Sequence, residues 1–281
     1  MKADVSGRSV LVTGGSLGIG RAISSELARR GARVIVAARG QEAIDETLAL
    51  LAGDGHRGIR LDVRDPAQWV GAIAAVDAQG HLHGLVCCAG ILGPVGRFDE
   101  ISLEAFTETL AVNVIGTLLA LRHAVPRLER TGGRAVALSG GGATSPLPRY
   151  DAYAASKVAL VRLVENVART TAVEVNAIAP GFVATRMHQA TLDAGPDRAG
   201  AAYYARTREQ LDAGGAPASA AAELACLLLS DATAGVSGRL VSAQWDPWRE
   251  PEFWTRLRSD PSLGTLRRID DQQFGALDDR G

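Results

Sequence analysis

Tyr153 and Lys157 are the residues of this chain whose types and spacing most directly suggest chemistry. They open a segment of helical periodicity, Tyr153–Thr171, so the phenol and the ammonium lie one turn apart on one face. A free phenol titrates near pH ~10. A neighbouring ammonium stabilises the phenolate and brings its proton exchange closer to neutral pH. The pair is suited to moving a proton to or from a substrate oxygen, although this spacing alone also occurs by chance.

A glycine-rich turn near the N-terminus is the second feature. Ser9–Gly15 has the pattern of a buried strand, and Ile19–Gly31 that of a helix ending at a glycine. Glycines let the backbone approach a phosphate, which the N–H groups and dipole of a helix N-terminus attract. The spacing Gly-x-x-x-Gly-x-Gly is not the commonest dinucleotide fingerprint, and a structural turn is the alternative. Its position between strand and helix favours nucleotide binding through Gly14, Ser16, Leu17, Gly18, Ile19 and Gly20.

The end of the next predicted strand, Ala32–Ala38, indicates which dinucleotide is bound. An acidic residue there would bind the ribose hydroxyls of NAD, whereas an arginine can pair with the 2′-phosphate of NADP. The chain has Arg39 at this point and no carboxylate beside it. A planar guanidinium suits phosphate recognition. We expect NADP rather than NAD as the cofactor; a solvated surface arginine is the alternative.

Strand and helix patterns alternate along the rest of the chain. Further strands are predicted at Gly58–Val63, Gly84–Ala89, Arg134–Ser139 and Val173–Ala179, and helices at Pro66–Val76, Leu103–Leu121 and Tyr153–Thr171. Such alternation with short connections predicts βαβ units. The expected fold class is α/β, with a single Rossmann-type, doubly wound parallel β-sheet and helices on both faces.

No linker or internal repeat marks a second folding unit. We expect residues 1–245 to form the dinucleotide-binding catalytic domain. Within it, residues 186–215 are polar, rich in Ala, Gly and Arg, and without a strand pattern. Such a stretch after a strand is often a substrate lid. Residues 246–281 are expected to form a C-terminal extension packed on the domain or on a neighbouring subunit.

The composition argues against other classes of protein. The 281 residues, 47% of them hydrophobic, can bury a large core, and 30 basic against 31 acidic residues leave almost no net charge. This balance argues against nucleic-acid or membrane-surface partners. No apolar run suggests a signal peptide or approaches the ~20 residues of a membrane span. Three cysteines, two of them adjacent, suggest no disulfide framework, and we expect a cytoplasmic location.

With the glycine turn, Tyr153-Ala-Ala-Ser-Lys157 resembles the short-chain dehydrogenase/reductase family, and the resemblance runs from about Gly7 to Val241. Further motifs occur in the order that this family has them. Asp62-Val63 resembles its adenine contact, Ala89-Gly90 the end of its Asn-Asn-Ala-Gly element, and Asn113 its helix-kinking asparagine. The segment from Asn176 resembles the one that holds the nicotinamide, through Pro180, Gly181, Val183 and Thr185.

The resemblance implies a role for each catalytic residue. Tyr153 would be the general acid/base, and Lys157 would lower its pKa and bind the nicotinamide ribose. Asn113 would hold a water molecule of the proton relay, and a serine would orient the substrate oxygen. Asn113, Tyr153 and Lys157 would thereby also belong to the cofactor site. Hydride would pass directly between cofactor and substrate carbon.

The serine is where the sequence departs from the family. The family usually places it thirteen residues before the tyrosine, and Gly140 stands there, one residue after Ser139. One extra loop residue would restore Ser139 to the role, and we prefer this interpretation. If positions are counted from the strand instead, Gly140 occupies the position of the catalytic serine. Thr144 or Ser145 could then supply a hydroxyl from the loop.

Cys87-Cys88 replaces the asparagine pair of the family and is a second departure. With His81 and His83 upstream, a metal site can be considered. Neighbours along a strand point to opposite faces, so these ligands would not converge on one tetrahedral ion. Buried cysteines acting as small hydrophobic residues are the better interpretation, and no metal is expected.

The predicted function is that of an NADP-preferring oxidoreductase interconverting a ketone or aldehyde and an alcohol. One alternative is an epimerase or dehydratase that uses bound nicotinamide on the same scaffold. The other is a non-catalytic nucleotide-binding regulator, against which the joint presence of Asn113, Tyr153 and Lys157 argues. The expected partners are a small-molecule substrate and further copies of the chain, as a homodimer or homotetramer built on the long helices. Arginines in residues 186–215 hint at a polar or anionic substrate.

Overall fold

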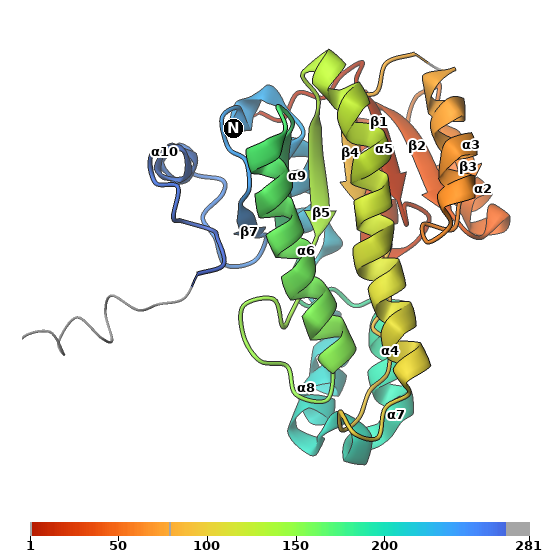
Figure 1. The fold of residues 1–281 in the computed structure, drawn as a ribbon, viewed down its shortest axis with the longest axis vertical. Helices are drawn as coiled ribbons and strands as arrows, with labels where there is room; N and C mark the ends of the chain where they lie inside the picture. Colours follow the sequence, from red (N-terminus) through yellow and green to blue (C-terminus); the bar gives the residue numbers. More distant parts are fainter. Residues whose placement is uncertain (1, 79, 268–281) are drawn as a thin grey trace, which may run out of the picture.

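A single seven-stranded parallel sheet forms the centre of the molecule in a computed structural model that describes residues 2–78 and 80–267 (Figure 1). Its strand order is β3-β2-β1-β4-β5-β6-β7, so the chain switches direction across the sheet between β1 and β4. This architecture confirms the expected fold class. The strands are β1 (Ser9–Thr13), β2 (Arg33–Ala38), β3 (Arg57–Arg60), β4 (Gly84–Cys87), β5 (Arg134–Leu138), β6 (Glu174–Ala179) and β7 (Leu240–Ser242).

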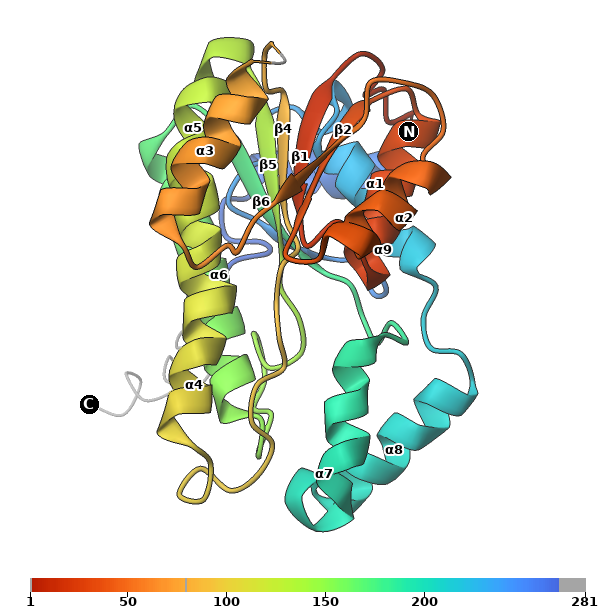
Figure 2. The same cartoon turned by 90° about the vertical axis from the view of Figure 1, so that its right-hand side faces the viewer.

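Helices cover both faces of the sheet (Figure 2). Leu27 of α1, Ile44 of α2 and Leu224 of α9 belong to the hydrophobic cluster on one face. Trp69 of α3 and Leu160 of α6 belong to the cluster on the other. The helices are α1 (Gly18–Arg29), α2 (Gln41–Leu50), α3 (Pro66–Asp77), α4 (Leu103–Leu110), α5 (Gly116–Thr131), α6 (Asp151–Thr170), α7 (Gln189–Ala199), α8 (Ala201–Asp212), α9 (Ala218–Leu228) and α10 (Pro251–Ser259).

The inner strands are buried on both faces, which explains their continuous apolar sequences. Every residue of β1, β4 and β5 is buried. Because helices cover both sides, these strands need no polar face and do not alternate. Their carboxyl ends all lie at one edge of the sheet, and the glycine turn and the residues that follow β4 and β5 therefore meet there.

The helix predicted over Leu103–Leu121 is longer than its sequence pattern suggests. It runs from Leu103 to Thr131 as α4, one π-helical turn (η1, Ala111–Ile115) and α5. Among the described residues it is the one helix that is long and apolar enough, by length and composition, to cross a membrane. The sequence analysis predicts no membrane-spanning segment. In the fold, α5 packs against α3, β4 and β5.

Several elements are absent from the sequence-based prediction. These are α2, α9, α10, the short edge strand β7, and the helices α7 and α8 within residues 186–215. The last two carry few apolar residues at helical spacing, and a break at Gly195, where φ is +74°, interrupts α7. Their periodicity is therefore weak, and only the surroundings of the segment make it helical.

The C-terminal extension packs on the domain as far as it is described. Trp254 and Leu257 of α10 join the same cluster as α1 and α9. The indole N–H of Trp254 donates to the carbonyl of Trp248 at 2.7 Å. Residues 268–281 of the predicted extension lie outside the described residues.

Candidate active site

One large cavity of about 2220 Å³ follows the carboxyl edge of the sheet. With one exception, every residue that the sequence assigns to cofactor or catalysis lines it; Asn113 is buried behind the wall. The lining predicted residues are Gly14, Ser16, Leu17, Gly18, Ile19, Gly20, Arg39, Asp62, Val63, Ala89, Gly90, Ser139, Tyr153, Lys157, Pro180, Gly181, Val183 and Thr185.

The glycine turn permits two backbone segments to touch. A Cβ on Gly14, where φ is +64°, would lie 2.7 Å from the backbone of Ala89, and one on Gly20 would lie 2.1 Å from the carbonyl oxygen of Gly14. Side chains at these positions would force the segments apart. Both glycines are therefore required by contacts of the fold, and the same contacts bring the turn to the floor of the cavity.

The first turn of α1 presents free backbone N–H groups to this floor. Its N-cap residue, Leu17, provides no side-chain hydrogen bond to them, and the first turn carries no acidic residue. Such a helix end attracts an anion. With the narrow glycine cradle beside it, the site fits the pyrophosphate of a dinucleotide.

Arg39 and Asp62 lie further along the same cavity. Arg39 is exposed at the end of β2. Asp62 receives a forked pair of hydrogen bonds from Arg64, which also pairs with Glu108. This guanidinium holds the pKa of Asp62 below its usual value. The arrangement keeps a carboxylate at the predicted adenine contact and a free guanidinium at the predicted phosphate contact.

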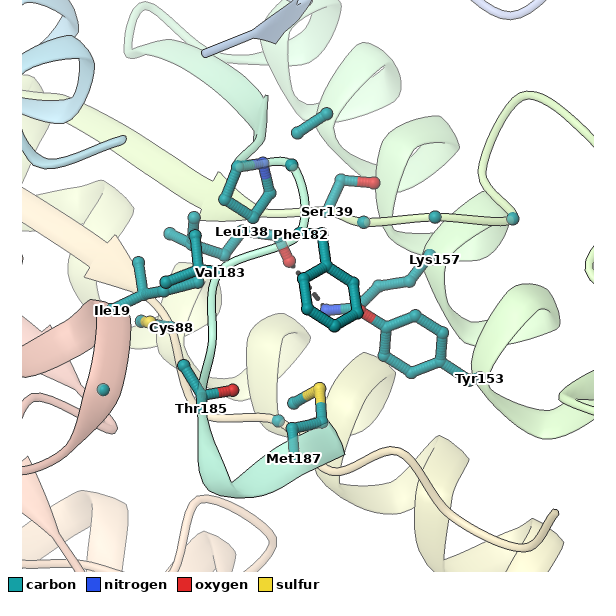
Figure 3. A pocket seen from close by; sticks show the side chains of 18 of the residues that line it. Ile19, Cys88, Leu138, Ser139, Tyr153, Lys157, Phe182, Val183, Thr185 and Met187 are labelled. Carbon is teal, nitrogen blue, oxygen red and sulfur yellow. Dashed lines mark hydrogen bonds between the residues drawn. The ribbon is translucent and has the colours of Figure 1, made fainter. Parts of the chain in front are cut away.

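Tyr153 and Lys157 extend from the first turns of α6 into the cavity (Figure 3). The ammonium of Lys157 donates to the carbonyl of Leu138 at 2.8 Å and lies 5.4 Å from the centre of the Tyr153 ring. Burial lowers the pKa of Lys157 to about 8 and raises that of Tyr153. The raised pKa of Tyr153 is opposite to the expected lowering, because burial of the phenol dominates and the neighbouring Tyr203 and Cys88 act in the same direction.

Asn113 occupies the π-helical turn η1 and fastens the loop after β4. Its amide exchanges two hydrogen bonds of 2.9 Å with the backbone of Ile91 and donates a third to Ser156. Its own carbonyl accepts from Thr117 at 2.9 Å. In this arrangement, the side chain positions the cavity wall between α6 and the strand ends and does not itself reach the cavity.

Gly140, rather than Ser139, faces the hydroxyl of Tyr153. A Cβ on Gly140 would lie 2.3 Å from that oxygen. The Ser139 hydroxyl is buried without a hydrogen-bond partner, and in Figure 3 it points away from Tyr153. Successive residues at the end of β5 point to opposite sides, and no inserted residue changes this alternation. The geometry therefore favours the alignment that places Gly140 in the position of the family's serine, and not the preferred assignment of Ser139. The two loop hydroxyls, Thr144 and Ser145, are exposed on the cavity rim.

The segment after β6 closes the cavity opposite the glycine turn. Val183 is buried, and the methyl group of Thr185 would be 3.2 Å from a Cβ on Gly18, so the two predicted cofactor segments lie side by side. Phe182 and His188 stack with their ring centres 3.9 Å apart. His188, which belongs to none of the sequence motifs, also lines the cavity.

Substitutions at Ser139 and Gly140 distinguish the two assignments. Ser139→Ala should leave kcat/KM within tenfold of the original, because the hydroxyl points away from Tyr153. Gly140→Ser should lower it, because the new Cβ must displace the Tyr153 hydroxyl. Steady-state kinetics of both variants provide the measurement. Loss of a preorganised donor lowers kcat by about 10²–10³, so a fall of that size in Ser139→Ala would restore Ser139 as the orienting hydroxyl.

Comparisons with known proteins identify the family. The short chain dehydrogenase family model matches residues 8–195. The chain is 35% identical over 202 residues to a chloroplastic NADPH-dependent aldehyde reductase-like protein of Arabidopsis thaliana, covering 65% of this chain and 75% of that protein. It is 37% identical over 190 residues to D-threitol dehydrogenase of Mycolicibacterium smegmatis, covering 64% and 72%.

Solved structures agree with this result. A variant of actinorhodin polyketide ketoreductase with NADPH aligns at a TM-score of 0.76 and 27% identity, covering 86% of this chain and 96% of that one. The family model extends from before β1 to α7 and thus includes the glycine turn, Asn113, Tyr153, Lys157 and Thr185. The chain belongs to the short-chain dehydrogenase/reductase family.

Proposed function

We propose that the protein reduces the carbonyl group of a small molecule with NADPH, or oxidises the corresponding alcohol with NADP. The observation that carries the proposal is that Tyr153 and Lys157 open into the same cavity as the glycine turn. The similarity to an NADPH-dependent aldehyde reductase-like protein and to D-threitol dehydrogenase supports carbonyl–alcohol chemistry. No similarity reported above favours an epimerase, a dehydratase or a non-catalytic regulator.

The residues of the cavity fit the cofactor in four places. The glycine turn and the first turn of α1 would hold the pyrophosphate, and Asp62 with Val63 would contact the adenine. Arg39 would pair with the 2′-phosphate. Val183 and Thr185, beside the glycine turn, would hold the nicotinamide end. When bound, the cofactor would supply or accept the hydride.

Tyr153 would donate the proton that completes carbonyl reduction. Because burial raises its pKa, the phenol is neutral and carries its proton at physiological pH. The substrate oxygen becomes strongly basic as its carbon is reduced, and it takes the proton from the Tyr153 hydroxyl. The Lys157 ammonium over the ring stabilises the phenolate that remains.

Tyr153→Phe tests the proposed acid directly. The variant should lose about 10²–10⁴ of kcat with any accepted carbonyl, because it loses the hydroxyl proposed as the general acid and general acid catalysis contributes that much. NADPH oxidation followed by absorbance gives the rate, and NADPH fluorescence titration should show unchanged cofactor binding. Tyr204→Phe, a half-buried tyrosine outside the cavity lining, is the matched control. Full activity of Tyr153→Phe would disprove the assignment.

The pH dependence of kcat/KM tests Lys157. Burial lowers its pKa to about 8, so the ammonium is charged below this pH and neutral above it. Reduction requires the charge, so kcat/KM should fall as the pH rises through about 8, a profile that reports the free enzyme. In Lys157→Arg, the guanidinium keeps its charge at these pH values. The decrease of kcat/KM in this variant should therefore occur at higher pH, whatever its overall rate. A wild-type profile with no decrease across this range would contradict the role.

Arg39→Ala tests the cofactor preference. Loss of a charge-assisted hydrogen bond to phosphate should raise the KM for NADPH about tenfold or more and leave that for NADH nearly unchanged. Arg57→Ala, an exposed arginine on the neighbouring strand β3 that does not line the cavity, is the control. If wild-type protein uses NADH as well as NADPH, or if Arg39→Ala affects both cofactors equally, the preference for NADP is refuted.

We also propose that the protein is a cytoplasmic homodimer or homotetramer. Support for self-association comes from apolar side chains exposed on the long helices: Ile115 and Leu118 are 45% and 41% exposed, and Val158 on α6 is 40% exposed. Support for a reducing compartment comes from Cys87, Cys88 and Cys226, which are free thiols. A purely monomeric species in light scattering would exclude the assembly.

A further inference from the structure

Trp245 differs from the other tryptophans of the chain in its exposure. Trp69, Trp248 and Trp254 are 0–4% exposed, whereas Trp245 is 83% exposed and lines the cavity. Exposure of so large an apolar surface is costly unless something covers it. The indole therefore requires an explanation that its three counterparts do not.

The backbone that carries Trp245 is held rigidly. It belongs to the turn after β7, in which the backbone N–H of Ser242 donates to Asp246 at 2.7 Å, and that of Trp245 donates to the Ser242 hydroxyl at 3.1 Å. Trp248 secures the turn from below, since its indole N–H donates to the carbonyl of Ala243 at 3.1 Å. The turn is fixed while its tryptophan side chain remains uncovered, as in a preorganised binding surface.

The turn also touches the segment that closes the nicotinamide end of the site. Gly181 has a φ of +81°, and a Cβ there would lie 2.2 Å from the side chain of Gln244, the neighbour of Trp245. The exposed indole is thus one residue from a direct contact with the Pro180–Thr185 segment. The backbone that carries the indole therefore lies beside the segment predicted to hold the nicotinamide.

The opposite wall near Tyr153 is mainly apolar. Leu92, Leu147, Met187 and Tyr203 all line the cavity and belong to one hydrophobic cluster with Tyr153. Of the arginines in residues 186–215, Arg186 and Arg206 line the cavity, Arg198 donates to the carbonyl of Val95, and Arg208 does not line the cavity. The apolar residues that cluster with Tyr153 are poorly suited to the hydroxyls of a sugar, which would lose their hydrogen bonds to water there.

We propose that Trp245 is a stacking platform that selects ketones and alcohols bearing an aromatic ring. The substrate ring lies on the indole, and its carbonyl reaches Tyr153. This inference rests on the proposed function and names its substrate class. It differs from the polar or anionic substrate suggested by the arginines: Arg186 and Arg206 line the cavity, but the residues that follow Trp245 in its lining include the carboxylates Asp246, Glu250 and Glu252.

Kinetics with matched ketones test the selection. Acetophenone and benzylacetone carry a ring at two distances from the carbonyl, and methyl hexyl ketone is the open-chain counterpart. Trp245→Ala should lower the ratio of kcat/KM for the better aryl ketone to that for methyl hexyl ketone about tenfold, chiefly through KM. Trp245→Phe should retain most of the preference. Phe98→Ala, whose side chain is 74% exposed outside the cavity, should not change the ratio.

Fluorescence provides a readout that does not depend on turnover. Trp245 is the one exposed tryptophan of the four in the chain, all of which the structure describes, so it should dominate the red edge of the emission and its quenching by iodide. α-Phenylethanol added to the NADP-loaded protein should protect this fraction from iodide. Trp245→Phe should lack the protected fraction, while Phe98→Ala should keep it.

The outcomes separate this inference from the proposed function. The stacking platform is overturned, and the proposed function stands, in either of two cases in which ketones are turned over. In the first, Trp245→Ala does not change the ratio of kcat/KM for aryl and open-chain ketones; in the second, α-phenylethanol does not protect Trp245 from iodide. Protection from iodide without turnover of any carbonyl supports the platform and refutes the function. A change in light-scattering mass in Trp245→Ala, with an unaltered ratio, assigns the indole to a subunit contact and overturns the inference.

Discussion

The backbone after β1 lies directly against the backbone after β4, with no room for a side chain between them. Gly14 approaches Ala89, and Gly20 packs on Gly14 within the turn. This close approach sets the position of the α1 N-terminus relative to the strand ends and so the depth of the cavity. A single methyl group at either glycine would displace one of two central strands or the first helix, because both neighbours are main chain and cannot rotate away.

From that contact, a chain of hydrogen bonds carries the geometry to the reacting residues. Ala89 leads to Ile91, which the Asn113 amide holds on both sides; Asn113 also bonds Ser156 on the helix that carries Tyr153 and Lys157. Lys157 in turn bonds the carbonyl of Leu138 at the end of β5. Contacts within the protein thus hold the residues of the site in place across β1, β4, β5 and α6. A site preorganised in this way loses little conformational entropy when a ligand binds.

The sequence allowed the parallel sheet, most of its strands and the cofactor edge to be predicted, because buried parallel strands and glycine turns leave clear local patterns. It could not identify α7 and α8, whose polar sequences become helical only beside the rest of the fold, nor β7, which has three residues. Successive residues at the end of β5 point to opposite faces of the sheet, and only one of Ser139 and Gly140 can face Tyr153. An alignment that is uncertain by one residue therefore exchanges the two assignments. The pKa of Tyr153 was misjudged because spacing reveals a neighbouring charge but not the burial that outweighs it.

Residues 186–212 leave the body of the protein and return to it at one place (Figure 2). Val183 and Gly215 form an isolated antiparallel bridge, and the N–H of Ala216 donates to the carbonyl of Phe182 at 2.7 Å. Further contacts of the segment come from a loop, as between Arg149 and the carbonyl of Asp197, and from the start of α6, where Tyr153 clusters with Met187 and Tyr203. The segment therefore resembles an interchangeable cassette: its length and composition can diverge in evolution, or be exchanged by grafting, while the sheet keeps its own folding free energy.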